Sequence, residues 1–132
     1  EPTLMDMVEQ GEKLSMLSVK AAETDRVANG IYMNKFFETY DFLICPTLPI
    51  VAFEAGQPNH PEFDDDTIGW TPLTGPFNLT GQPAASIPCG FDESGLPIGL
   101  QIIGPMYDDS GVLSCSLAFE NACTFLDRKP PL

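Results

Sequence analysis

Hydrophobic residues recur at helical spacing through the first third of the chain. The positions that share this spacing are Leu14, Leu17, Ala21, Ala28, Tyr32, Phe36 and Tyr40. Such spacing places side chains on one stripe of an α-helix, so it predicts a long amphipathic helix across these residues. A shorter helix is predicted before it, around Leu4–Glu9, with Thr3 as its N-cap and Gly11 at its end.

The pattern then changes to short apolar runs that are typical of strands. Asp41–Cys45 is one such run, and the prolines that follow it stop a buried strand there. Ala84–Phe91 and Pro97–Gly104 are two further runs, joined by a turn in which Gly95 can adopt a positive φ. Because the second run is apolar on both faces, it belongs inside a layered sheet that is covered on both sides.

Two segments complete the pattern. Val51–Thr74 is polar and proline-rich without periodicity, which is typical of a functional or mobile loop. A last helix is predicted to begin at Asp108 or Asp109 and to end at Pro130-Pro131. Its apolar positions are Val112, Cys115, Phe119, Ala122 and Leu126.

This order of elements predicts an α/β fold, in which helices pack on part of a mixed β-sheet. Two or three strands that are apolar on both faces cannot be covered by two helices, so we expect other strands to lie alongside. The length of 132 residues favours a single unit over residues 1–132.

The charge of the chain limits the classes of partner that it is expected to bind. The chain has 6 Lys and Arg residues against 19 Asp and Glu residues, a formal net charge of −13. Such a field repels phosphate backbones and anionic lipids, so neither nucleic acid nor a membrane is an expected partner. No apolar run approaches the roughly 20 residues that span a bilayer, and no secretion signal is visible, so we expect a cytoplasmic protein.

Metal ions and cofactors are not expected. Cys45, Cys89, Cys115 and Cys123 form no C-x-x-C pair, and the chain has 1 His, which argues against zinc and favours free thiols. The acidic residues of the segment 54–66 could hold Ca²⁺ in principle. They lack the spacing of an EF-hand loop, so we interpret them as a solvated charge run.

One segment carries a family resemblance. Pro76–Phe91, which contains Asn-Leu-Thr-Gly-Gln-Pro-Ala-Ala-Ser-Ile-Pro in a predicted turn and strand, continues into Leu96–Gly104. Together they closely resemble the C-terminal part of amidase signature enzymes, the serine amide hydrolases that use a Ser, Ser and Lys triad. No Gly-Gly-Ser-Ser stretch is present, and His60 lies in a proline-flanked loop. Ser86 lies in mid-strand, where we interpret it as a small hydroxyl packed against a neighbour instead of a nucleophile. We therefore assign no catalytic residue.

The resemblance implies a contribution to the substrate pocket. By position in the family, the candidate substrate-binding residues are Thr47, Trp70, Thr74 and Phe77. Family members that transfer an amide from glutamine carry an acidic residue before the Asn-Leu turn. Here Gly69-Trp70-Thr71-Pro72-Leu73 stands in that place, which favours the general amidase type.

The sequence is therefore interpreted as the C-terminal portion of a serine amide hydrolase, which converts a carboxylic amide to an acid plus ammonia or an amine. Because the chain begins with Glu1 instead of Met, we expect that a catalytic N-terminal core has been removed. This portion would bind a small-molecule amide only together with that core. We expect it either to form a homo-oligomer or to pair with the N-terminal portion. The alternative is a stand-alone, non-enzymatic binding or interaction module.

Overall fold

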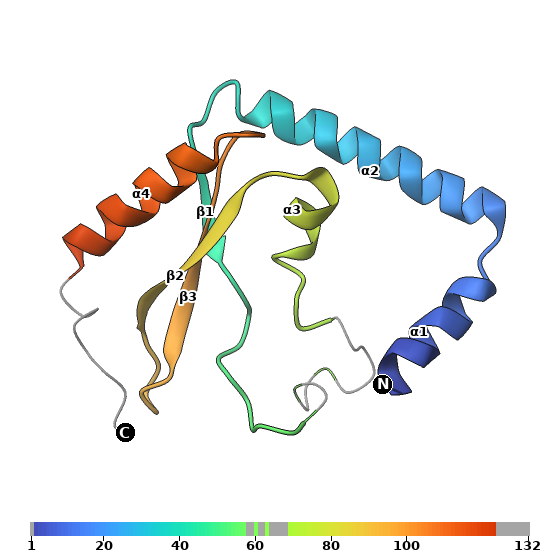
Figure 1. Cartoon of the computed structure of the whole chain (residues 1–132), viewed down its shortest axis with the longest axis horizontal. Coiled ribbons are helices and arrows are strands. Elements are labelled where there is room, and N and C mark those ends of the chain that lie inside the picture. The colour runs from blue at the N-terminus through green and yellow to red at the C-terminus, as the bar shows by residue number, and fades with distance from the viewer. Residues whose placement is uncertain (1, 58–59, 61–62, 64–68, 124–132) are drawn as a thin grey trace.

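A computed structural model of the chain describes residues 2–57, 60, 63 and 69–123. It has the predicted α/β character, with helices on both sides of a three-stranded sheet (Figure 1). Its elements are α1 (Pro2–Glu12), α2 (Met16–Phe36), β1 (Leu43–Pro46), α3 (Gly75–Thr80), β2 (Ala84–Phe91), β3 (Pro97–Ile103) and α4 (Asp109–Ala122).

The sheet has the order β1-β3-β2, and both pairings in it are antiparallel. All three strands lie where the apolar runs predicted them; β2 has the predicted bounds, and β1 extends to Pro46. Both prolines within the outer strands fit this arrangement, because an edge strand or a bulge tolerates a missing N–H. Pro46 ends β1, and Pro88 precedes a register shift at which Cys89 has no partner on β3.

The turn between β2 and β3 has the predicted chemistry. Gly95 adopts a φ of 87°, and its N–H donates to the carbonyl of Asp92 at 3.1 Å. The Asp92 carboxylate accepts hydrogen bonds from the backbone N–H groups of Ser94 and Leu96, at 3.0 and 2.7 Å. All of these hydrogen bonds join residues of the turn to one another, so the turn is stabilised locally.

One face of the sheet packs against α4. Ile87, Ile102 and Val112 form the buried cluster there, and Ile102 is completely inaccessible. Asp108 is the N-cap of α4, as predicted, and its carboxylate accepts from the Gly111 N–H at 3.0 Å. The helix ends at Ala122 instead of continuing to the prolines at 130–131, because Cys123 is extended with a φ of −102° and a ψ of 127°. Along the predicted stripe, Cys115 and Phe119 are half-buried and Ala122 is exposed, whereas Leu126 lies outside the described residues.

On the opposite face lies the segment that precedes α3, whereas α3 itself packs against α2 (Figure 1). Gln101 of β3 is buried there, and its amide N–H donates to the carbonyl of Leu73 at 2.9 Å. The sequence predicted a polar turn around Asn78, but these residues form the short helix α3. Pro76 in its first turn sets a helical φ, and Gly81 ends it with a φ of 81°.

The helix α1 differs from its prediction at both ends. It begins at Pro2 and runs through Gly11 to Glu12, so neither Thr3 nor Gly11 bounds it. Glycine is tolerated there because it lies in the last turn, where it interrupts little of the helix. The next helix, α2, begins after Ser15, whose hydroxyl accepts from the Ser18 N–H at 3.0 Å.

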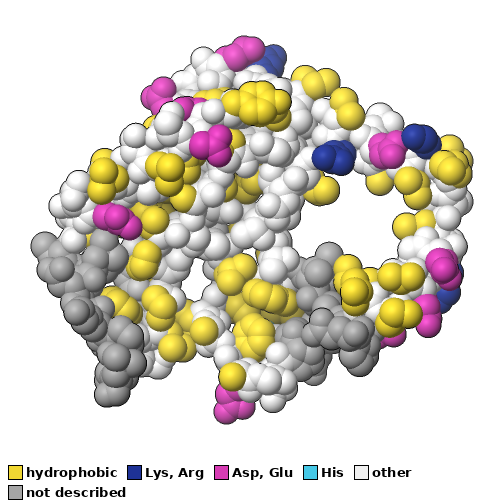
Figure 2. All heavy atoms as spheres, viewed as in Figure 1, with side chains coloured by type: hydrophobic (Ala, Val, Ile, Leu, Met, Phe, Trp, Pro, Cys, Tyr) yellow, Lys and Arg dark blue, Asp and Glu magenta, His cyan; other side chains and the backbone are white. Residues whose placement is uncertain are grey.

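The apolar stripe of α2 is exposed instead of packed. Leu17 is 81% and Tyr32 68% exposed, and α2 has no buried residue among those described. Figure 2 shows hydrophobic side chains along the α1–α2 arm and an opening between this arm and the sheet. The chain exposes 9766 Å², whereas a folded monomer of this size exposes about 6,800 Å². None of the helices in the described part of the chain is both long and apolar enough to span a bilayer.

Candidate functional site

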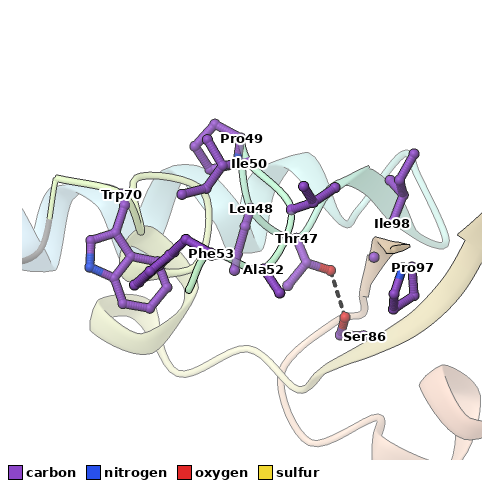
Figure 3. Close-up of a pocket in the computed structure, with 12 residues that line it drawn as sticks. Thr47, Leu48, Pro49, Ile50, Ala52, Phe53, Trp70, Ser86, Pro97 and Ile98 are labelled. Carbon is purple, nitrogen blue, oxygen red and sulfur yellow. Dashed lines mark hydrogen bonds between the residues drawn. The ribbon is translucent and has the colours of Figure 1, made fainter. Parts of the chain in front are cut away.

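A cavity of about 570 Å³ opens where the chain leaves β1 and passes the β2–β3 hairpin (Figure 3). We call it the Trp70 cavity. It is lined by the segment 47–53, by Trp70, by Ser86 of β2 and by the segment 97–99 of β3.

The segment 47–53 is held at the sheet by one hydrogen bond beyond β1. The Thr47 N–H donates to the Gly99 carbonyl at 2.8 Å, so Thr47 continues the line of β1 by one residue. Pro49 has no N–H and cannot continue this pairing. The chain therefore turns away at Pro49, and its apolar side chains form a wall of the cavity (Figure 3).

Two hydroxyl groups face each other at one side of the cavity. The Thr47 Oγ1 and Ser86 Oγ atoms lie 2.6 Å apart, and either can be the donor. Gly99 makes this approach possible, because a Cβ atom there would lie 2.8 Å from Thr47 Oγ1 and 3.0 Å from Ser86 Oγ. The pair thus depends on three segments that are distant in the sequence.

Aromatic rings form the far wall. The rings of Phe53 and Trp70 meet edge to face with centroids 5.7 Å apart, and the His60 ring lies 5.9 Å from that of Phe53, also edge to face. Edge-to-face contacts hold such rings in a fixed orientation. The cavity is therefore apolar along most of its length and polar at the hydroxyl pair.

The structure brings together two of the four predicted substrate-binding residues. Thr47 and Trp70 both line the cavity, but Thr74 and Phe77 do not. Thr74 is the N-cap residue of α3, and its hydroxyl donates to the Thr71 carbonyl at 3.2 Å. Phe77 is half-buried in α3.

Sequence reasoning missed most of the wall. Phe53 lies in the segment 51–74, which the sequence predicts to be a polar loop, and Ile50 lies just before it with no predicted role. For Ser86 the sequence favours a hydroxyl packed against a neighbour. The hydroxyl pair agrees with that interpretation of Ser86. A useful signal was present, because the apolar run Leu48-Pro49-Ile50-Val51-Ala52-Phe53 continues after the strand has ended.

The cavity offers binding groups without a base. In the described part of the chain, no Asp, Glu, Lys, Arg or His lines it. A serine needs an adjacent base to become a nucleophile, and the hydroxyl partner of Ser86 is another hydroxyl. As it stands, the arrangement can accept and donate hydrogen bonds and can surround an apolar group.

Metal-ligating side chains do not gather in the described part of the chain. It contains no cluster of three or more His, Cys, Asp or Glu side chains, and the four cysteines are free thiols. Most of the acidic run lies outside the described residues, namely Glu62 and Asp64–Asp66.

The chain is similar to curated proteins that are much longer. It is 41% identical over 101 residues to a glutamyl-tRNA(Gln) amidotransferase subunit of Rippkaea orientalis, a match that covers 75% of this chain and 20% of that protein. It is 43% identical over 99 residues to the corresponding protein of Brevibacillus brevis, with 74% and 19% covered. The chain therefore spans about a fifth of the length of these relatives.

Solved structures agree with this relationship. A bacterial aryl acylamidase of the amidase signature enzymes superposes with a TM-score of 0.82 at 28% identity, covering 100% of this chain and 29% of that one. The glutamyl-tRNA(Gln) amidotransferase subunit of Thermotoga maritima superposes with a TM-score of 0.66 at 27% identity, covering 91% and 28%. A profile of the Amidase family matches residues 5–113. This chain belongs to the amidase family, as the resemblance of Pro76–Phe91 and Leu96–Gly104 predicted.

Proposed function

We propose that this chain forms the substrate-pocket portion of an enzyme that hydrolyses carboxylic amides to an acid and ammonia or an amine. The observation that supports this proposal is the Trp70 cavity, which has apolar walls and two hydroxyl groups. Two residues that the family resemblance implies for substrate binding, Thr47 and Trp70, lie in that cavity. We retain Thr74 and Phe77 as candidates for a surface that only the whole enzyme completes.

The catalytic serine and its base would come from polypeptide outside this chain. Ser86 faces a hydroxyl, and no base lines the cavity among the described residues. The chain spans about a fifth of its curated relatives, so four-fifths of their length remains to supply these groups. We therefore propose that the 132 residues alone do not turn over an amide.

A second candidate function is transfer of an amide group, because the curated relatives are amidotransferase subunits with 41% and 43% identity. Two observations favour hydrolysis instead. The aryl acylamidase superposes more closely than the Thermotoga protein, with TM-scores of 0.82 and 0.66. The segment 69–73 also lacks the acidic residue expected in members that use glutamine.

We further propose that the exposed α1–α2 arm pairs with other polypeptide. Residues 1–36 hold four of the 6 Lys and Arg residues and six of the 19 Asp and Glu residues, a net charge of −2. The rest of the chain therefore carries −11. The nearly neutral, apolar arm suits burial, and the acidic remainder suits contact with water in the cytoplasm. The missing core is the proposed partner, and a second copy is the alternative.

Reading the DNA upstream of the Glu1 codon tests the fragment proposal. An open frame that encodes a Gly-Gly-Ser-Ser loop and a preceding Lys would support it, whereas a start codon beside Glu1 would favour a stand-alone binding module. The longer protein is then assayed with acetanilide beside the 132-residue chain. We expect release of aniline from the longer protein only. Turnover by the short chain that disappears in Ser86→Ala would contradict the proposal.

A further inference from the structure

We propose that the Trp70 cavity is a subsite for the neutral, aromatic or short alkyl part of an amide, whose carbonyl or amide N–H bonds to the Thr47–Ser86 hydroxyl pair. This inference deepens the proposed function and rests on it for the chemical class of the substrate. It names which atoms of this chain would select that substrate and what they would exclude. It also departs from the expectation that an amide binds only together with the missing core, because every lining group named here belongs to this chain.

The hydroxyl pair has bonding capacity left for a ligand. Each hydroxyl has one hydrogen and two lone pairs, and one hydrogen is used between Thr47 and Ser86. Among the described residues, each side chain has only the other as its hydrogen-bond partner. One O–H therefore remains to donate to a carbonyl oxygen, and lone pairs remain to accept an amide N–H. The donating hydroxyl also polarises its neighbour, which strengthens the next bond in the chain.

The walls fit a flat, apolar body. Phe53 and Trp70 present their rings on one side, and Pro97 and Ile98 of β3 line the cavity as well (Figure 3). A volume of about 570 Å³ lies within the range of small-molecule sites, which are mostly apolar with a few polar groups that fix orientation. The polar group of the ligand would therefore be fixed at the hydroxyl end, with its apolar body along the rings.

The same lining selects against charged ligands. The described lining residues include no Lys, Arg, His, Asp or Glu, so a carboxylate or ammonium in the cavity would meet no counter-ion among them. Removing such a charge from water without a partner is strongly unfavourable, whereas a neutral amide needs only hydrogen bonds. We therefore infer that the subsite prefers an uncharged aryl or alkyl amide to a zwitterionic amino acid amide.

Fluorescence of Trp70 gives a direct test, because the chain contains 1 Trp. The full 132-residue chain is titrated with benzamide, with toluene, which lacks the hydrogen-bonding group, and with the anion benzoate. We expect saturable quenching by benzamide, with toluene and benzoate at least about tenfold weaker. Equal affinity for all three probes, or no quenching by any of them, would overturn the inference.

Variants assign the effect to the hydroxyls. We expect Thr47→Val and Ser86→Ala each to weaken benzamide binding about three- to tenfold and to leave toluene binding unchanged. Thr47→Ser keeps a hydroxyl and should retain most of the affinity, which separates the role of the hydroxyl from a packing defect. Thr24→Val is the matched control, because the Thr24 hydroxyl donates to the Lys20 carbonyl of its own helix. Loss of benzamide binding in this control, or unchanged binding in Thr47→Val, would contradict the subsite.

The two proposals can fail separately. Benzamide binding by the short chain requires no catalysis, so the subsite stands if it occurs even where the longer protein hydrolyses nothing. Conversely, an active longer protein in which Thr47→Val leaves the KM for acetanilide unchanged would keep the proposed function and overturn the subsite.

Discussion

Thr47 and Ser86 are 39 residues apart in the chain, yet their side-chain oxygens lie 2.6 Å from each other. Thr47 reaches this position through its backbone bond to Gly99, and Ser86 reaches it through the pairing of β2 with β3. The sheet thus brings two ordinary hydroxyls into one polar spot at the side of an apolar cavity. Their contact is a sensitive measure of whether the hairpin and the segment after β1 are correctly assembled.

Replacing Gly99 should disturb that contact. In Gly99→Ala the new Cβ would lie 2.8 Å from Thr47 Oγ1, so the two hydroxyls and the segment after β1 must shift. We expect a loss of about 1–3 kcal/mol in the free energy of unfolding, measured by urea titration. Gly90→Ala is the matched control in the same hairpin, because nothing lies within 4 Å of a Cβ placed there. Equal losses in both variants would contradict the predicted close approach.

Shortening Ile102 should destabilise the sheet strongly. Its side chain is fully buried between the sheet and α4, so Ile102→Ala leaves a cavity in the packed cluster. We expect a loss of about 2–5 kcal/mol in a denaturant melt. Ile44, its partner across the β1–β3 ladder, is 61% exposed, and Ile44→Ala should cost much less. A loss below about 0.5 kcal/mol for Ile102→Ala would show that the strand is not packed as described.

The Asp92 turn should make stability depend on acidity. Hydrogen bonds from the Ser94 hydroxyl and then from the Leu96 N–H lower the pKa of the Asp92 carboxyl in the folded chain. The folded state therefore binds this proton more weakly than the unfolded state, whose Asp pKa is about 3.9. The stabilisation is complete above that unfolded value and disappears as the pH falls through the lower folded one.

Urea midpoints against pH measure this effect. We expect Asp92→Asn to be less stable than the wild type near neutral pH. The difference between their urea midpoints should shrink toward zero as the pH falls below the pKa of Asp92 in the folded chain. Glu93→Gln makes the same change of net charge one residue away and is the matched control. A difference in stability that stays constant over this acidic pH range would contradict the role of the Asp92 hydrogen bonds.

The exposed α1–α2 arm should make the isolated chain associate. Sedimentation at micromolar concentration is expected to show dimers or larger species, because the arm leaves a wide apolar surface in water. Leu17, which is 81% exposed on α2, is the position to change. Leu17→Glu should reduce association, whereas Leu113→Glu on the outer face of α4, where the side chain is 66% exposed, should not. A well-ordered monomer of the unaltered chain would refute the pairing proposal.

Local patterns were sufficient for the strands and for the start of α4, but not for its end at Ala122. The bounds of β2, the positive φ of Gly95 and the Asp108 cap all follow from residues within a few positions of one another. The short helix α3 was missed because six residues are too few to show a period. Its two end signals, Pro76 and Gly81, were nevertheless present in the sequence.

The Trp70 cavity was only half predictable. Family resemblance pointed to Thr47 and Trp70, but their neighbours Phe53 and Ser86 are brought together by tertiary packing, which no local pattern records. The α2 stripe shows a different limit. Its spacing correctly predicted a helix, but spacing cannot say which polypeptide covers the stripe, and the described residues do not cover it.

The arm formed by α2 also has a mechanical consequence. Its 21 residues make a rod about 30 Å long. The Arg26 side chain ties the middle of this rod to α3, through a bond from Nε to the Leu79 carbonyl at 2.7 Å. A displacement of α2 would therefore act on α3 through this bond and through the packing of the two helices. A polypeptide that binds the α1–α2 arm would therefore also influence the position of α3.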